Sequence, residues 1–316
     1  MTQAKAVKGS SGVTTAKTAG TTRGLSVVVP AVNQLSDVVD CLVALERERR
    51  DVDLEVIVVD RLGERVRRQV RGLFPWVKLI EVTTDQTIPQ MRALAFRAAT
   101  RDAVAVIEDH VIVPQGWARQ MLDALDAGAD VVGGSVDNAA CDTLMDWAAF
   151  LCEYSHLIPP IEGGSVGGLT GNNVVYRREL LERYREVTEA GEWENYLHEK
   201  LKQDGVELIC RPEIVVGHKK HYTFGEYMSQ RFLYARSYAG KRAKGSPLKK
   251  LAYGAGSAAL PPLLLYRIVT RIAAKHRHQA LLAKSTPLIA MFVTSWAAGE
   301  VVGSLFGEGD SLSKVC

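Results

Sequence analysis

The chain has 316 residues, of which 47% are hydrophobic and 24% charged, and its formal net charge is +3. These values fit a globular protein with a sizeable core, and so small a net charge gives no support for nucleic-acid binding. The five cysteines are scattered without a CxxC pair, which argues against a disulfide framework or a zinc cluster and suits a reducing compartment.

The N-terminal segment 1–24 is rich in Ser, Thr, Gly, Ala and Lys and has no apolar stretch of the secretory-signal type. We expect a disordered tail here. From residue 25 onward, apolar β-branched runs alternate with segments of helical periodicity. The predicted strands are 25–30, 54–60, 77–82 and 104–107, and the predicted helices lie within 36–50, 61–72 and 88–99.

This alternation predicts an α/β fold with a mainly parallel sheet covered by helices. Ligands of such sheets bind beyond the carboxyl ends of the strands. Pro30, Asp60 and the tripeptide Glu108-Asp109-His110 all follow predicted strands, so polar chemistry is expected at one edge of the sheet. The first strand is not followed by a GxGxxG and no P-loop occurs, so dinucleotide and Walker-type sites have no support.

The tripeptide Glu108-Asp109-His110 interrupts two apolar runs. A hard divalent cation such as Mg2+ or Mn2+ takes carboxylate oxygens, and Mn2+ also tolerates imidazole. Taken alone, the tripeptide is equally compatible with a solvated acidic turn.

The second half of the chain combines further short elements with a basic turn and a basic, aromatic helix. The turn is His218-Lys219-Lys220-His221, and the helix spans 224–241. That helix is either a solvated basic face or a surface for the phosphates of a nucleotide or an anionic lipid. The remaining predicted helices are 117–127, 146–154 and 196–203, and the remaining strands are 131–136, 206–210 and 214–216, with a short apolar run at 174–176.

Residues 251–316 are predicted to form a hydrophobic, membrane-associating helical region. The segments 251–266 and 285–306 are almost free of charge, and the second is long enough to span a bilayer. A two-span hairpin would place the basic connector between them outside, against the positive-inside rule. Three arrangements stay open: such a hairpin, interfacial helices on an anionic leaflet, and buried helices of a soluble homo-oligomer. We favour membrane association.

In this order, the residues resemble a family 2 glycosyltransferase of the GT-A fold over about 25–244. The runs Ser26 to Asn33 and Glu55 to Asp60 resemble the first two strands of the family. The helix 89–95, with Arg92, resembles the one that approaches the diphosphate, and Glu108-Asp109-His110 stands where the family has its DxD metal motif. Gly171-Asn172-Asn173 resembles the GGN-type segment beside the donor sugar and the acceptor.

The resemblance implies a GT-A glycosyltransferase domain over 25–250, with a Rossmann-like, mixed but mainly parallel sheet flanked by helices. It also implies Glu194 as the catalytic base. It implies a divalent metal, Mn2+ or Mg2+, bound by Asp109, His110 and His218. The implied acceptor or sugar contacts are Gly171, Asn172, Asn173 and Trp193. The implied donor contacts are Pro30, Asn33, Asp60, Arg92, Glu108, Asp109 and Lys219.

The chain departs from the family pattern in three places. The metal motif ends in a histidine, Asp60 is followed by Arg61 instead of a second acid, and the base is a glutamate with Glu192 as a competitor. The second departure leaves the nucleotide base open.

The implied activity is that of an inverting, metal-dependent hexosyltransferase-type enzyme. It would move a sugar from a UDP- or GDP-type donor to a hydroxyl of a glycan or lipid-linked acceptor in envelope or exopolysaccharide biosynthesis. A membrane-associated bacterial member at the cytoplasmic face of the cell membrane would fit the C-terminal region. Two alternatives remain: a sugar nucleotidyltransferase, which usually has a Gly-rich basic loop after its first strand, and a catalytically inactive membrane-bound interaction protein.

Overall fold

The structure, a computed structural model, describes residues 24–242 and 246–315. The predicted tail 1–24 therefore lies, apart from Gly24, outside the described residues. Within the described part the strands form one nine-stranded sheet in the order β3-β2-β1-β4-β8-β6-β9-β5, with β7 paired to β9. The strands are β1 (Leu25–Ala31), β2 (Leu54–Asp60), β3 (Lys78–Glu81), β4 (Ala103–Val106), β5 (Val111–Ile112), β6 (Val131–Asn138), β7 (Gly164–Ser165), β8 (Val174–Arg177) and β9 (Leu208–His218).

The first half of the sheet is parallel, as the alternation in the sequence predicts. β1 lies between β2 and β4, and β3 pairs with the outer side of β2. Successive residues of β1 face opposite sides, so Val27 packs toward one hydrophobic cluster and Val28 toward the other. The helices of this half are α1 (Leu35–Glu48), α2 (Glu64–Leu73), α3 (Ile88–Ala98) and α4 (Trp117–Asp126). Residues of α1, α2 and α4 join the cluster of Val27, and those of α3 join the cluster of Val28.

Local sequence sets where two of the helices begin. Thr87 and Gln90 form a capping box at the start of α3, and Pro89 occupies its first turn. Thr143 and Asp146 form a second capping box, so α5 (Leu144–Tyr154) begins two residues before the predicted position. α5 then packs against the C-terminal helices.

The second half makes the sheet mixed, as expected for the GT-A fold, because β8 inserts antiparallel between β4 and β6. It differs from the prediction in one respect: the segments predicted as strands 206–210 and 214–216 form one strand, β9. The pairing of β6 with β9 shifts register at Gly134, where a Cβ atom would lie 1.9 Å from the carbonyl oxygen of Ile214. A glycine is therefore required there. The helices on this side are α6 (Arg178–Arg183), α7 (Arg185–Glu189) and α8 (Glu194–Gln203), of which only α8 is expected from the sequence.

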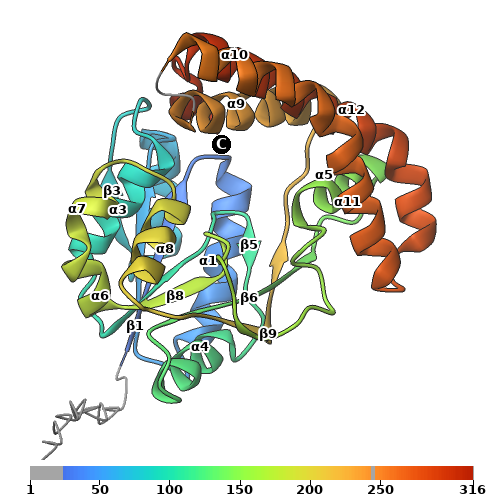
Figure 1. Cartoon of the computed structure of the whole chain (residues 1–316). Helices are drawn as coiled ribbons and strands as arrows, with labels where there is room; N and C mark the ends of the chain where they lie inside the picture. Colours follow the sequence, from blue (N-terminus) through green and yellow to red (C-terminus); the bar gives the residue numbers. More distant parts are fainter. Residues whose placement is uncertain (1–23, 243–245, 316) are drawn as a thin grey trace, which may run out of the picture.

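The C-terminal helices cover the carboxyl edge of the sheet and extend to one side of it (Figure 1). α12 lies against α9, α5, α10 and α11. Gly299 and Gly303 allow close packing on α9, because a Cβ atom at either would lie 2.3–2.4 Å from a carbonyl oxygen of that helix. These elements are α9 (Phe224–Arg242), α10 (Pro247–Gly256), η1 (Ser257–Ala259), α11 (Leu260–Ala274), α12 (Gln279–Phe306) and η2 (Ser311–Lys314).

Among the described residues, α12 is the single helix that is long and apolar enough to cross a membrane, and 44% of its most apolar 18-residue window is buried inside the protein.

Candidate active site

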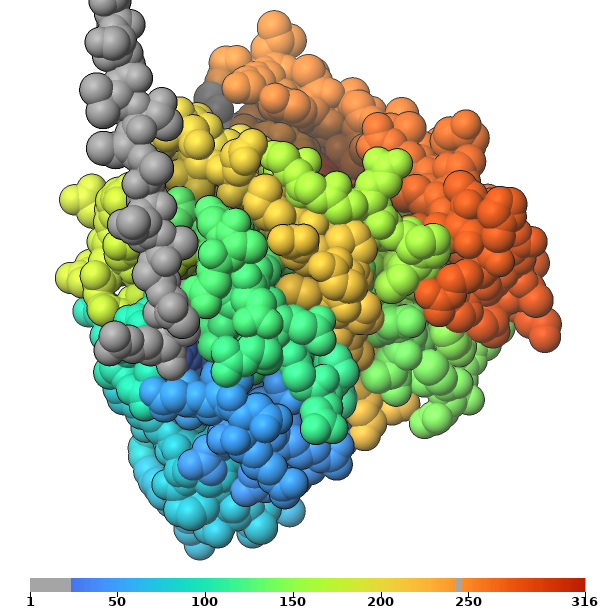
Figure 2. Space-filling view, turned by 90° about the horizontal axis from the view of Figure 1, so that it is seen from below, coloured from blue at the N-terminus to red at the C-terminus, as the bar shows by residue number. Residues whose placement is uncertain are grey.

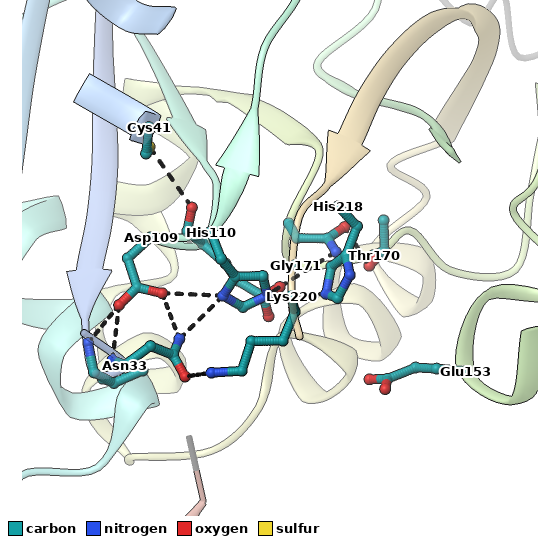
Figure 3. Close-up of polar contacts among 12 residues, drawn as sticks. Asn33, Cys41, Asp109, His110, Glu153, Thr170, Gly171, His218 and Lys220 are labelled. Carbon is teal, nitrogen blue, oxygen red and sulfur yellow. Dashed lines mark hydrogen bonds and ion pairs between the residues drawn. The ribbon is translucent and has the colours of Figure 1, made fainter. Parts of the chain in front are cut away.

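Two histidines and a glutamate converge at the carboxyl edge of the sheet. The Nε2 atoms of His110 and His218 lie 2.9 Å apart, and Glu108 Oε2 lies 3.3 Å from His110 Nε2. The backbone brings them together, because Val111 in β5 pairs with His218 at the end of β9. Figure 3 shows the two imidazoles side by side, with Lys220 and Asn33 below them.

The carboxylate of Asp109 faces away from this group. It is fully buried and accepts hydrogen bonds from the backbone N–H of Val32 and Asn33 at 2.7 and 2.9 Å and from Asn33 Nδ2 at 2.5 Å. Its Oδ1 atom also lies 3.0 Å from His110 Nδ1. Asp109 thus fixes the turn after β1 and orients the imidazole. Of the predicted metal ligands, the structure groups His110 and His218, and it places Glu108 instead of Asp109 with its carboxylate facing them.

The charges of Glu108, His110 and His218 shift one another's pKa values. Burial alone would lower the pKa of His110, but the hydrogen bonds and charges of Asp109 and Glu108 outweigh it and raise the pKa to about 9. Burial would raise the pKa of Glu108, but the hydrogen bond and charge of His110 lower it to about 2. Burial and the charge of His110 hold the pKa of His218 well below its usual range.

Glu108, His110 and His218 fit a divalent cation. One ligand atom from each lies within 4.8 Å of the others, and both histidines are buried. Asp109 Oδ1 lies against Nδ1 of His110, which leaves Nε2 facing the group, an arrangement common around metal-bound histidines. Two nitrogens and one oxygen suit Mn2+ better than Mg2+, which prefers oxygen ligands.

These three residues open into a cavity, here called the central cavity. Pro30, one of the predicted donor residues, lines it. Glu153 on α5 also lines it and projects toward His218 from the opposite side (Figure 3). Glu153 could not be predicted from the sequence, because its helix follows the tripeptide Glu108-Asp109-His110 by more than thirty residues. The other lining residues are Val32, Ile88, Glu108, Asp109, His110, Tyr154, His218, Tyr222 and Tyr234.

Glu194 lies beside the central cavity, in a neighbouring cavity with Arg92 and Gly171. It begins α8, and its Oε2 atom accepts a hydrogen bond from Arg92 Nη1 at 2.7 Å. Arg92 is buried and also donates to the carbonyl of Gly171 at 2.9 Å. The sequence suggested that Arg92 approaches the diphosphate, whereas the structure directs it to Glu194. The competitor Glu192 instead pairs with Lys241.

The segment Gly171-Asn172-Asn173 connects the two cavities. A Cβ atom at Gly171 would lie 2.7 Å from the side-chain ends of both Arg92 and Glu194, so a larger residue would displace this pair. Asn172 Nδ2 donates to Tyr154 Oη at 2.9 Å and lies 3.3 Å from Glu108 Oε2. Asn173 faces inward, where its amide donates to the carbonyls of Ser135 and Ile214. Asn172 thus faces Glu108, while Asn173 joins β6 to β9.

Two other predicted residues have local partners. Asp60 is fully buried, accepts a hydrogen bond from Arg67 Nε at 2.7 Å and caps the loop after β2. Lys219 pairs with Asp40 of α1 at 2.6 Å. Its neighbour Lys220, not Lys219, reaches the site, where Nζ bonds the side-chain oxygen of Asn33.

The C-terminal segment 311–315 returns to the same edge of the sheet. Arg61 donates to the carbonyl oxygen of Val315 at 2.6 Å and to that of Gln86 at 3.0 Å. Val315 is fully buried and packs with Ile88 of the central cavity and with Trp193, whose neighbour is Glu194. The edge that follows β2, expected to receive the nucleotide, is therefore covered in part by the end of the chain.

Comparison with known proteins gives one family match. Residues 26–185, just over half of the chain, match the family model described as Glycosyl transferase family 2. No curated protein matches the chain in sequence.

A solved mannosyltransferase structure shares the fold. A mannosyltransferase from Pyrobaculum calidifontis, PcManGT, solved in complex with GDP-Man and Mn2+, has 17% sequence identity and a TM-score of 0.52 over 89% of this chain and 87% of that chain. A structure of S. aureus TarS 1-349 has 14% identity and a TM-score of 0.48 over 88% and 90% of the two chains. At this level of identity the likeness concerns the fold alone, which is the GT-A arrangement.

Proposed function

The chain belongs to glycosyl transferase family 2, and we propose that it is an inverting glycosyltransferase that moves a sugar from a nucleoside-diphosphate sugar to a hydroxyl group. The observation that carries the proposal is the placement of Glu108, His110 and His218 around one point, with the Arg92–Glu194 pair in the adjoining cavity. The cluster of Glu108, His110 and His218 suits a cation that stabilises a leaving diphosphate. The Arg92–Glu194 pair suits removal of a proton from the acceptor hydroxyl.

Glu194 is the proposed general base. Its carboxylate is partly exposed, with 24% of the side chain accessible, and one oxygen is fixed by Arg92. The carboxylate would take the proton of the acceptor hydroxyl while that oxygen attacks the anomeric carbon from the face opposite the leaving group. The result is inversion, and a positioned base contributes about 10^2 to 10^4 in rate.

Glu108, His110 and His218 are the proposed ligands of a divalent cation, Mn2+ in preference to Mg2+. When bound, such a cation supplies positive charge that stabilises a leaving diphosphate. Asp109 keeps His110 in position, and Asn172 does the same for Glu108 through its contact with Oε2. Lys220, fixed by Asn33, adds a positive charge next to this group.

The donor class and the acceptor rest on the structural comparison and on the position of the C-terminal helices. We infer a UDP- or GDP-type donor, since the P. calidifontis enzyme with the same fold binds GDP-Man together with Mn2+. A glycan or lipid-linked hydroxyl is the proposed acceptor, because the apolar C-terminal helices cover the sheet edge that carries the site and extend to one side of it (Figure 1).

The test is a thermal-shift screen of UDP- and GDP-sugars with and without Mn2+. A donor at 100 times its Kd stabilises the folded state by about 2.7 kcal/mol. We expect stabilisation by one nucleotide class, dependent on Mn2+, followed by slow release of the nucleoside diphosphate when water replaces the acceptor. A catalytically inactive interaction protein would bind and release nothing, and that result would overturn the proposal.

A further inference from the structure

The charges of the C-terminal third are strongly segregated. Between Glu226 and Glu300 the sequence has no acidic residue, whereas the same stretch contains twelve lysines and arginines. Glu300 itself is buried in α12 and pairs with Arg242 of α9. The exposed part of this region therefore has a positive potential with no acidic side chain of its own to balance it.

The outer sides of α10 and α11 combine this charge with exposed apolar side chains. Leu248 and Leu251 of α10 are 77% and 59% exposed, and Leu263 and Tyr266 of α11 are 41% and 68% exposed. Within each helix the two residues are three positions apart, so they share one face. Exposed basic residues flank these positions, namely Lys249, Arg267 and Arg271, together with the half-buried Lys250.

The contacts of the connector between α11 and α12 exclude a hairpin that crosses a bilayer. Lys275 Nζ donates to the carbonyls of Ile158 and Pro160 at 2.6 and 2.8 Å, and Arg277 donates to that of Pro159 at 2.9 Å. The connector is thus fixed to the loop after α5 and cannot lie across a membrane from it. α12 is also packed between α9 and the outer helices, with Ser295 bonded to a carbonyl of α9.

We propose that the outer face of α10 and α11 docks on an anionic lipid bilayer without crossing it. Leu248, Leu251, Leu263 and Tyr266 would enter the headgroup region, where a face of apolar and basic side chains binds by combined burial and charge. Lys249, Lys250, Arg267 and Arg271 would pair with lipid phosphates, their aliphatic stems lying along the apolar boundary. Figure 2 shows the C-terminal helices, orange to red, along one side of the molecule, away from the blue N-terminal part.

Vesicle co-sedimentation of the full chain without nucleotide tests this proposal independently of any transfer activity. The probes are phosphatidylcholine vesicles alone and vesicles with about 30 mol % phosphatidylglycerol, an anionic lipid. We expect binding to the anionic vesicles alone, weakened at high salt because ionic screening shortens the range of surface charges.

Two variants probe the two contributions. Leu248→Ser/Leu251→Ser/Leu263→Ser/Tyr266→Ser removes the apolar contacts, and Lys249→Glu/Lys250→Glu/Arg267→Glu/Arg271→Glu reverses the charges. Each should weaken vesicle binding by about a hundredfold or more. The matched control Arg47→Glu/Arg50→Glu/Arg65→Glu/Arg68→Glu changes the net charge equally at exposed positions of α1, the turn after it and α2, and should retain most of the binding.

Three outcomes would overturn the proposal. The first is equal binding to neutral and anionic vesicles, and the second is an equal loss in the control variant. The third is a different occupant of the face, seen either as salt-sensitive binding to duplex DNA or RNA that the vesicles do not compete for, or as a dimer in analytical ultracentrifugation that the serine variant dissociates.

Discussion

The Nε2 atoms of His110 and His218 lie 2.9 Å apart although the residues are separated by 108 positions in the chain. Neither residue could be brought there by local structure. The pairing of β5 with the end of β9 creates the contact, and Glu108 completes a three-residue group suited to a cation.

The first prediction concerns metal affinity. His218→Ala should weaken Mn2+ binding by about 100-fold or more, since even residues that only hold a metal ligand in place contribute about 10- to 100-fold. Isothermal titration calorimetry of the purified protein measures this directly. His221→Ala is the matched control, because His221 lies three residues away and contacts Asp146 instead. Mg2+ should bind more weakly than Mn2+ to the unmodified chain; equal affinity would contradict the ligand set.

The second prediction concerns pH and the stability of the metal-free protein. The pKa of Glu108 is lowered to about 2, so its stabilising contribution is present above its unfolded pKa of about 4.3 and is lost as pH falls toward 2. The pKa of His110 is raised to about 9, so its contribution is present below about 6.5 and is lost as pH rises through 9.

Urea unfolding across this pH range measures the free energy of unfolding, including its fall toward acid pH (the acid limb) and its fall toward alkaline pH (the alkaline limb). Glu108→Gln should flatten the acid limb, and it should reduce the alkaline limb as well because a neutral side chain no longer favours protonated His110. An unchanged profile in this variant would show that other groups dominate the pH dependence.

The third prediction separates the two candidate bases. Glu194→Gln keeps the hydrogen bond to Arg92 but cannot accept a proton, so turnover should fall by about 10^2 to 10^4 while donor affinity is retained. Glu192→Gln is the control, since Glu192 pairs with Lys241. Single-turnover transfer with a donor found in the thermal screen gives the rates. Normal turnover by the Glu194 variant would remove it as the base.

The fourth prediction concerns the C-terminal segment. Arg61→Met leaves the buried carbonyl of Val315 without its donor, which should cost about 1–3 kcal/mol of stability and free the segment. Thermal unfolding and the rate of C-terminal digestion by carboxypeptidase test the two effects. Arg65→Met, at an exposed position, should change stability by no more than about 0.5 kcal/mol. Slow digestion in both variants would mean that Arg61 does not hold the segment.

The fifth prediction concerns the packing of α12. Gly303→Val places a Cβ atom 2.4 Å from the carbonyl oxygen of Arg236, closer than van der Waals contact allows, and should destabilise the fold by about 1–3 kcal/mol or more. Gly256→Ala has open space and helical backbone angles, so it should be neutral or slightly stabilising. Equal unfolding midpoints for the two variants would contradict close packing of α12 on α9.

The parallel half of the sheet could be predicted because its strands are buried on both sides. β1 and β2 therefore appear as unbroken apolar runs, and their alternation with amphipathic helices defines the α/β class. The second half was harder to predict. β9 contains Arg211 and Pro212 at its register shift, which divides one strand into two apparent ones, and α6 and α7 are too short to show a helical period.

The sequence by itself determined which residue types follow the strands, and thereby placed polar chemistry at one edge of the sheet. Tertiary structure alone decided how these residues divide their work. In the turn after β4, Asp109 faces the N–H groups after β1, whereas Glu108 and His110 face His218. Arg92 meets Glu194 across 102 positions, and the end of the chain reaches Arg61. The physical reason is that side-chain direction in a turn, and any contact between distant segments, depends on how the strands pair and pack, which residue type and spacing do not specify.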